Sequence, residues 1–249
     1  MNRTDLGGTR ALITGGTSGY GRALADRLAA RGARVMVVGR DPGRLDAARR
    51  AGHTAVRADL TVPDDRHAAV AQACDQLGGL DLLVQSAAVQ TEVDLITYAP
   101  RTTVQKLQDE VVADLVAPIA FTVEALPLLR HGSPARVAFV TSTLGFAPKR
   151  SAPAYCAAKA GLVAFALSLR RQLHHEAPTV RSTIITLPLV DTPMTAGRAQ
   201  GAMSSADAAR GTVRALERGR DDIDIGIAGP FRLLHRMAPG AAGRITRDA

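Results

Sequence analysis

Short apolar runs alternate with segments of helical periodicity along nearly the whole chain, and this alternation constrains the fold more than any other feature. We predict strands at residues 10–14, 34–39, 54–57, 80–85, 136–141, 181–187 and 222–227. We predict helices at residues 21–31, from 41 onward, and at 63–77, 102–130 and 154–176. Repeated strand–helix–strand units predict a doubly wound α/β fold with a parallel sheet between two layers of helices.

The chain length and composition favour one globular domain over residues 1–249. Hydrophobic residues make up 46% and charged residues 22%, which is typical of a folded protein. We expect no apolar run of membrane-spanning length, hence no integral membrane contact, and no signal peptide in the polar residues 1–6. Two cysteines, Cys74 and Cys156, form neither a disulfide scaffold nor a zinc site, so the sequence predicts a cytoplasmic protein without a metal.

The net charge is +8, yet the sequence does not favour a nucleic-acid partner. The basic residues are scattered, and only Lys106, Lys149 and Lys159 among the 31 are lysines. Trp is absent and aromatic residues make up 3%, so platforms for stacking bases are scarce. We interpret the charge as a solvated basic surface.

A glycine-rich turn joins the first predicted strand to the first helix. Its candidate ligand residues are Gly15, Thr17, Ser18, Gly19, Tyr20 and Gly21. Glycines let the backbone approach a pyrophosphate, and the helix N-terminus supplies free N–H groups and a positive dipole end. The turn predicts dinucleotide binding, although the spacing G-x-x-x-G-x-G also fits a glycine turn without a ligand.

The end of the second strand bears on the choice of cofactor. An acidic residue there would bind the ribose 2′-hydroxyl of NAD, but the chain has Gly39-Arg40. The guanidinium of Arg40 suits a 2′-phosphate. The sequence therefore favours NADP(H), and NAD(H) remains the less favoured alternative because Asp41 is adjacent.

Tyr155 and Lys159 are spaced four residues apart and so lie on one face of a predicted helix. A neighbouring ammonium lowers the pKa of a phenol and makes it a better acid and base near neutral pH. Ser142 follows the fifth strand and is expected at the same edge of the sheet. A buried tyrosine beside a surface lysine is the alternative interpretation.

Together these motifs resemble the classical short-chain dehydrogenase/reductase family over essentially the whole chain. The resemblance implies a Rossmann-type, seven-stranded, mostly parallel sheet. It implies that Tyr155 is the general acid or base, that Ser142 hydrogen-bonds the substrate carbonyl, and that Lys159 lowers the tyrosine pKa and holds the nicotinamide ribose. Further cofactor contacts are implied for Asp59, Leu60, Ser86, Ala87, Val190 and Thr192. Family members are usually homodimers or homotetramers.

The chain departs from the family pattern at three places. The usual Asn-Asn-Ala-Gly is replaced by residues 85–88, Gln-Ser-Ala-Ala, and the Pro-Gly after the sixth strand is Leu187-Pro188. The asparagine expected in the middle helix is Asp114. In the family that asparagine helps to hold a water in the proton relay behind the lysine. A carboxylate cannot donate a hydrogen bond and adds negative charge, so Asp114 is a candidate catalytic residue with altered properties.

Residues after the strand ends are candidates for the substrate pocket, namely Gln90, Leu144, Phe146 and Met194. They are mostly apolar, which suits an apolar small molecule, though ordinary core packing fits them as well. The leading hypothesis is an NADP(H)-dependent oxidoreductase that reduces a carbonyl or oxidises the alcohol. The alternatives are a non-redox cyclase, isomerase or dehydratase on the same scaffold, and a protein that only senses NADP(H).

Overall fold

The structure is a computed structural model that describes residues 4–97, 100–131, 134–198 and 200–247. The start of the chain, where we expect no signal peptide, lies partly outside these residues. The strands are β1 (Arg10–Thr14), β2 (Arg34–Gly39), β3 (Thr54–Arg57), β4 (Leu82–Gln85), β5 (Ala135–Ser142), β6 (Val180–Leu187), β7 (Val190–Asp191), β8 (Met203–Ser204) and β9 (Asp222–Asp224). The α-helices are α1 (Gly19–Ala29), α2 (Pro42–Arg50), α3 (Pro63–Leu77), α4 (Pro100–Val111), α5 (Ala117–Arg130), α6 (Pro153–Glu176), α7 (Ser205–Glu217), α8 (Ala228–Met237) and α9 (Pro239–Thr246).

Seven strands form one parallel sheet in the order β3-β2-β1-β4-β5-β6-β9. The chain winds outward in one direction from β1 to β3 and in the other from β4 to β9, so the direction reverses between β1 and β4. A crevice at the carboxyl ends of the strands is expected at such a reversal. The predicted Rossmann-type fold is confirmed.

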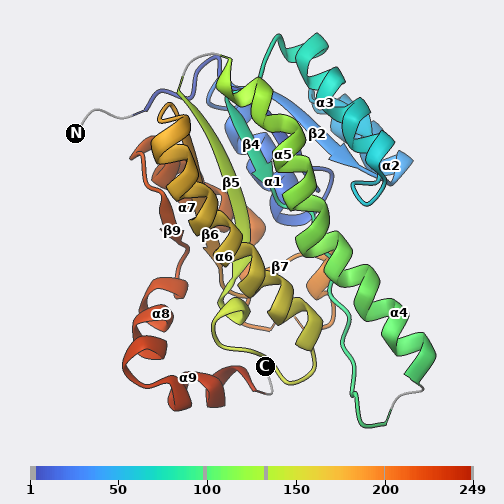
Figure 1. Cartoon of the computed structure of the whole chain (residues 1–249), viewed down its shortest axis with the longest axis vertical. Coiled ribbons are helices and arrows are strands. Elements are labelled where there is room, and N and C mark those ends of the chain that lie inside the picture. The colour runs from blue at the N-terminus through green and yellow to red at the C-terminus, as the bar shows by residue number, and fades with distance from the viewer. Residues whose placement is uncertain (1–3, 98–99, 132–133, 199, 248–249) are drawn as a thin grey trace.

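Helices cover both faces of the sheet, and each face has its own apolar core (Figure 1). Successive strand residues point to opposite faces, so Ala11 and Ile13 pack with α1 and α7, while Leu12 packs with α3, α5 and α6. Strands buried on both sides are apolar throughout, which is why the sequence showed continuous Val, Ile and Leu runs.

Two strands are shorter than predicted. β4 begins at Leu82, two residues late, and Asp81 just before it forms a bidentate ion pair with Arg10 at the edge of the ladder. β9 ends at Asp224, since Gly226 turns the chain with a φ of +56°. The two-residue strands β7 and β8 pair with each other and were not predicted.

The predicted middle helix is present, but a π-helical segment, Val112–Val116, separates α4 from α5. Pro118 has no N–H to donate to the carbonyl of Asp114 four residues earlier, so regular α-helical bonding is interrupted here. The wider turn places Asp114 inside the protein with no exposed surface.

The stretch Arg101–Arg130 is long and apolar enough to span a membrane by length and composition. The expectation that no such run exists is therefore wrong. Core helices of soluble proteins meet the same criterion, and Phe121, Ala125 and Leu129 of this stretch pack in the second apolar core.

Candidate active site

Tyr155, Lys159 and Ser142 are brought together at the carboxyl end of β5. Tyr155 and Lys159 lie in the first turns of α6, and Lys159 Nζ is 5.3 Å from the centre of the Tyr155 ring. Ser142 is the last residue of β5, hydrogen-bonds to Tyr155, and accepts a hydrogen bond from the Leu144 N–H at 3.2 Å. The arrangement places a phenol, an ammonium and a hydroxyl in mutual reach.

The charges around Tyr155 act on its pKa in opposite directions. Burial raises the pKa of Tyr155, and the nearby carboxylate of Asp114 raises it further. The ammonium of Lys159 and the hydrogen bond from Ser142 lower it, but burial outweighs them. Tyr155 is therefore a neutral phenol at rest and carries a proton that it can donate.

Asp114 is an ion-pair partner of Lys159. Its Oδ2 lies 3.3 Å from Lys159 Nζ, and its Oδ1 accepts a hydrogen bond from the Val89 N–H at 2.8 Å. Burial alone would lower the pKa of Lys159, but Asp114 and Tyr155 reverse the effect and raise it. Lys159 thus remains an ammonium, and the predicted role of Asp114 beside the lysine has a geometric basis.

Glu110 is a residue that sequence reasoning missed. It precedes Asp114 by one helical turn, has 1% of its surface exposed, and accepts a hydrogen bond from the Thr91 N–H at 3.2 Å. The signal in the sequence was a pair of acidic residues four apart in an apolar helix, since like charges at this spacing repel each other unless one is neutralised.

The glycine turn after β1 is packed so closely that side chains cannot enter it. A Cβ on Gly15, whose φ is +64°, would lie 2.8 Å from the Ala87 Cα. A Cβ on Gly21 would lie 2.5 Å from the carbonyl oxygen of Gly15. A Cβ on Gly39 would lie 2.5 Å from Thr17 Oγ1. Gly15 and Gly21 therefore let the backbone of the turn pack tightly, without side chains, at the start of α1.

The turn meets the loops that follow β4 and β6. Thr14 Oγ1 accepts hydrogen bonds from the backbone N–H groups of Ser86 and Ala87, at 2.9 and 3.1 Å. On the other side, a Cβ on Gly19 would lie 3.0 Å from Thr192. Ser18 is the N-cap of α1 but makes no side-chain capping bond. Residues predicted to bind one cofactor from three loops thus border the same helix N-terminus.

Arg40 and Asp59 form an ion pair with a separation of 3.0 Å between Nη1 and Oδ2. The side chain of Arg40 is 65% exposed, so most of its guanidinium donors face solvent. Although burial raises the pKa of Asp59, hydrogen bonds from Thr61 and Arg40 lower it below its ordinary value. The two predicted cofactor residues are neighbours, and the carboxylate offsets part of the positive charge of Arg40.

In three other predicted cofactor residues, the side chain or the carbonyl is engaged in contacts within the protein. The Tyr20 side chain is buried and its hydroxyl bonds to Thr212 at 2.8 Å, which leaves only its backbone for the predicted contact. The Leu60 carbonyl accepts from Arg66, and Val190 is buried in the first apolar core.

The four predicted substrate residues fall into two groups. Arg198 donates to the Met194 carbonyl at 3.0 Å and to Gln90 Oε1 at 3.3 Å, so these two lie together beside the loop after β6. Leu144 and Phe146 follow Ser142. The ring of Phe146 is covered by Phe231, at a centroid distance of 5.8 Å. Phe146 is therefore packed under α8, a contact that the sequence did not predict.

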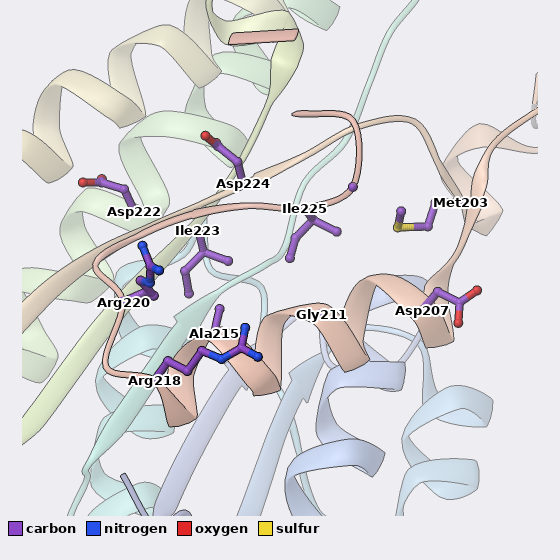
Figure 2. A pocket seen from close by; sticks show the side chains of 11 residues that line it. Met203, Asp207, Gly211, Ala215, Arg218, Arg220, Asp222, Ile223, Asp224 and Ile225 are labelled. Carbon is purple, nitrogen blue, oxygen red and sulfur yellow. The ribbon is translucent and has the colours of Figure 1, made fainter. Parts of the chain in front are cut away.

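A cavity of about 450 Å³ lies between α7 and the segment that contains β9 (Figure 2). Its apolar floor includes Ile223 and Ile225, and Arg218 and Arg220 stand at one end. None of the residues predicted for catalysis, cofactor or substrate lines it. Among the described residues no group of three or more His, Cys, Asp or Glu is suited to hold a metal ion.

The sheet order, the bare glycine turn and the Tyr–Lys pair define a dinucleotide-binding α/β protein of the Rossmann type. The family model described as short chain dehydrogenase matches residues 9–202. The chain belongs to the classical short-chain dehydrogenase/reductase family, a family of oxidoreductases that use nicotinamide cofactors.

Two curated relatives illustrate the similarity. "Uncharacterized oxidoreductase DltE" of Bacillus subtilis is 34% identical over 184 residues, which cover 73% of this chain and 71% of the relative. Cis-1,2-dihydrobenzene-1,2-diol dehydrogenase of Pseudomonas putida is 33% identical over 181 residues, which cover 71% of this chain and 64% of the relative.

Solved structures with a lower identity share the fold. Ligand-free aldohexose dehydrogenase of Thermoplasma acidophilum has a TM-score of 0.77 at 18% identity, over 90% of this chain and 94% of the other. A short chain dehydrogenase of Burkholderia cenocepacia in complex with NADP has a TM-score of 0.77 at 24% identity, over 89% and 98%.

Gly15→Ala tests the closeness of the turn, with Gly52→Ala as its matched control. Both glycines have a positive φ, +64° and +87°, but a Cβ on Gly52 meets nothing within 4 Å. Both variants should lose about 1–2 kcal/mol of stability from backbone strain. Gly15→Ala should lose about 1–3 kcal/mol more because it overlaps Ala87. Urea unfolding and dinucleotide titration should show that only Gly15→Ala also loses cofactor binding; equal behaviour of the two variants would contradict the close packing.

Proposed function

We propose that this protein is an NADP(H)-dependent oxidoreductase that reduces the carbonyl of an apolar small molecule, or oxidises the corresponding alcohol. The observation that carries the proposal is the group formed by the buried Lys159 and the half-buried Tyr155 and Ser142 at the carboxyl end of β5. A neutral phenol whose proton is in reach of an ammonium is suited to donate that proton to a carbonyl oxygen.

The bare backbone of the glycine turn fits a dinucleotide. A Cβ is excluded at Gly15 and Gly21 by the protein's own backbone, so these glycines let the turn fold tightly onto the N-terminus of α1, whose free N–H groups suit a pyrophosphate. In this proposal Lys159 holds the nicotinamide ribose, and the approach of Thr192 to Gly19 supports a further cofactor contact from the loop after β6. When bound, NADPH supplies a hydride to the carbonyl carbon.

The chain's own residues supply the proton and the orientation. The hydroxyl of Ser142 donates a hydrogen bond to the substrate oxygen and holds it near Tyr155. Tyr155 Oη transfers its proton to that oxygen as negative charge develops. Lys159 stabilises the phenolate that remains, because an ammonium close to a buried anion offsets its desolvation.

An apolar substrate class is supported by two observations. Leu144 lies two residues after Ser142 and brings an apolar side chain to the end of β5, whereas Phe146 packs against Phe231 of α8. Similar proteins include a dehydrogenase of cis-dihydrobenzenediol. The proposal treats residues 1–249 as one domain and places the protein in the cytoplasm, where Cys74 and Cys156, both free thiols, remain reduced.

We further propose a homodimer or homotetramer built through α5 and α6, which lie side by side on one face of the sheet (Figure 1). Both helices expose apolar side chains, Val123 of α5 at 57% and Leu167 of α6 at 41% exposure, and Val116 at the end of the π-helical segment is 50% exposed. Apolar side chains gathered on one surface favour a protein contact.

A non-redox reaction on the same scaffold is the second candidate. It is favoured by one observation, the carboxylate of Asp114 beside Lys159, which makes Tyr155 a weaker acid than it would be without that charge. Product formation without NADPH consumption would support this candidate against the first.

Tyr155→Phe removes the proton donor and keeps the ring. We expect kcat for NADPH-dependent carbonyl reduction to fall by at least about 10²-fold. The Kd for NADPH, measured by calorimetry, should stay within about twofold because the cradle is unchanged. A variant that keeps wild-type turnover would end the acid–base assignment.

Arg40→Ala tests the reading of the 2′-phosphate, and Arg50→Ala is the control because it removes an equal charge from the far end of α2. Loss of a charge-assisted hydrogen bond should weaken NADPH binding by about 10- to 100-fold and leave NADH binding nearly unchanged. Arg50→Ala should change neither. If all three proteins have the same ratio of NADPH to NADH affinity, the phosphate is recognised elsewhere.

Val123→Asp tests the proposed assembly surface. A carboxylate buried in an apolar contact is costly, so the subunit Kd measured by sedimentation velocity should rise at least about tenfold. Val62→Asp is the control, since Val62 is 42% exposed and is the N-cap of α3, where aspartate is favourable. A wild-type chain that sediments as a monomer would refute the assembly.

A further inference from the structure

Glu110 is a buried carboxyl that the proposed function leaves without a role. It lies in the last turn of α4, and 1% of its surface is exposed. Its Oε2 accepts a hydrogen bond from the Thr91 N–H, whereas Oε1 is buried and has no hydrogen-bond partner among the described residues. A charged oxygen without a donor is costly inside a protein, and a proton bound there removes that cost.

Glu110 and Asp114 are held in the same way by one stretch of backbone. The segment after β4 donates the Val89 N–H to Asp114 at 2.8 Å and the Thr91 N–H to Glu110 at 3.2 Å. The two N–H donors are two residues apart, and the two acceptors are one helical turn apart. The segment therefore fixes both carboxyls on the side of the helix that faces α6.

The charges that face Glu110 do not balance if both acids are ionised. Asp114 comes from its own helical stretch, and Lys159 and Cys156 come from α6. Burial raises the pKa of the Cys156 thiol, which therefore stays neutral. Among these described groups, two carboxyls share the single positive charge of Lys159.

The electrostatic environment favours one bound proton. Burial raises the pKa of Glu110 and outweighs the hydrogen bonds from Thr91 and the charge of Lys159, which lower it, while the charge of Asp114 acts in the same direction as burial. Burial also raises the pKa of Asp114, although Lys159 and the Val89 N–H act in the opposite direction. Interacting acids of this kind titrate as a pair, so the proton belongs to both.

A small cavity lies beside Thr91, the residue that donates a hydrogen bond to Glu110, although Glu110 itself does not line it. Its volume is about 20 Å³, which is enough for one water molecule. Its lining includes Thr91, whose N–H is hydrogen-bonded to Glu110, and the exposed residues Glu92 and Lys106. A water here would lie between the surface of the protein and the segment that binds the acid pair.

We propose that Glu110 and Asp114 share one proton in the resting enzyme, and that this proton is the store from which Lys159 re-protonates Tyr155 after each turnover. The inference rests on the proposed function, and it adds to it a relay residue that acts through Asp114 and touches neither substrate nor cofactor. Asp114 is the link because its Oδ2 is 3.3 Å from Lys159 Nζ.

The proton balance of a carbonyl reduction closes with this pair. The substrate carbon receives the hydride, and the substrate oxygen receives the Tyr155 proton, so an alcohol forms and a phenolate remains. Lys159 Nζ gives a proton to Tyr155 Oη, and Asp114 Oδ2 gives the stored proton to Lys159 Nζ. The pair, now doubly charged, takes one proton from solvent.

Glu110→Gln is the decisive variant, because an amide keeps the shape of the side chain but cannot bind and release the stored proton. We expect kcat for reduction to fall about tenfold, less than the loss caused by removing the direct acid. KM should stay within about twofold, since no substrate contact is lost. Asp109→Asn is the matched control: Asp109 is the preceding residue, exposed and bonded to Gln105, and its variant should behave as wild type.

The pH profile separates a relay from a structural role. The stored proton is lost as the pH rises through the raised pKa of the pair, so wild-type kcat for reduction should fall over that pH range. Glu110→Gln should lose that limb, whereas Glu110→Asp, which restores an acid, should regain it. An unchanged limb in Glu110→Gln, or a loss of activity with no change in profile, would overturn the proposal.

Infrared difference spectroscopy tests the acid pair without any turnover. The wild type minus Glu110→Gln spectrum at neutral pH should contain the carbonyl stretch of a protonated carboxylic acid, and the band should vanish on alkalinisation. Absence of the band refutes the shared proton even in an active enzyme. A band in a protein that shows no NADPH-dependent turnover would instead refute the proposed function and leave the acid pair established.

Discussion

The buried ion pair between Lys159 and Asp114 is the interaction on which the rest of the site depends. Both side chains are almost fully withdrawn from water, so each charge needs the other. The pair joins the middle helix to α6. It thereby fixes the position of Tyr155, which lies one turn before Lys159 in α6. It also keeps Lys159 charged, which is the condition for stabilising a phenolate. The same contact therefore holds the two helices together and keeps Lys159 in the charged form that the proposed reaction needs.

The parallel sheet supplies the second constraint. Because all seven strands run in one direction, their carboxyl ends place residues from distant parts of the sequence at a single edge. Thr14 from β1 holds the backbone after β4, and Gly19 approaches Thr192 after β6. The cofactor cradle is thus a property of sheet order, and glycines appear where these loops come too close for a side chain.

Local patterns were sufficient for the fold, since strands buried on both faces and helices with caps leave strong signals. Alternation and the glycine turn predicted the seven-stranded sheet and its helices as far as α6, whereas no bounds were predicted for α7, α8 and α9. Helical spacing predicted that Tyr155 and Lys159 share a face. The π-helical segment was not predicted, because Pro118 indicates an interruption but not the manner in which the helix compensates. Long-range pairings were also invisible: no local signal places Asp59 against Arg40, or Phe231 over Phe146.

The replacement of an asparagine by Asp114 acquires a physical meaning only together with Glu110. An amide at this position would leave one buried carboxyl opposite one ammonium, and the charges would balance without a bound proton. A carboxylate adds a negative charge in a place where water cannot compensate it, so a proton must be retained nearby. Glu110 Oε1 and Asp114 Oδ2 are both buried without a hydrogen-bond partner among the described residues, so a proton retained by this pair satisfies an oxygen on either acid. The altered residue is therefore better understood as half of an acid pair than as the loss of an asparagine, and the two residues should be studied as one unit.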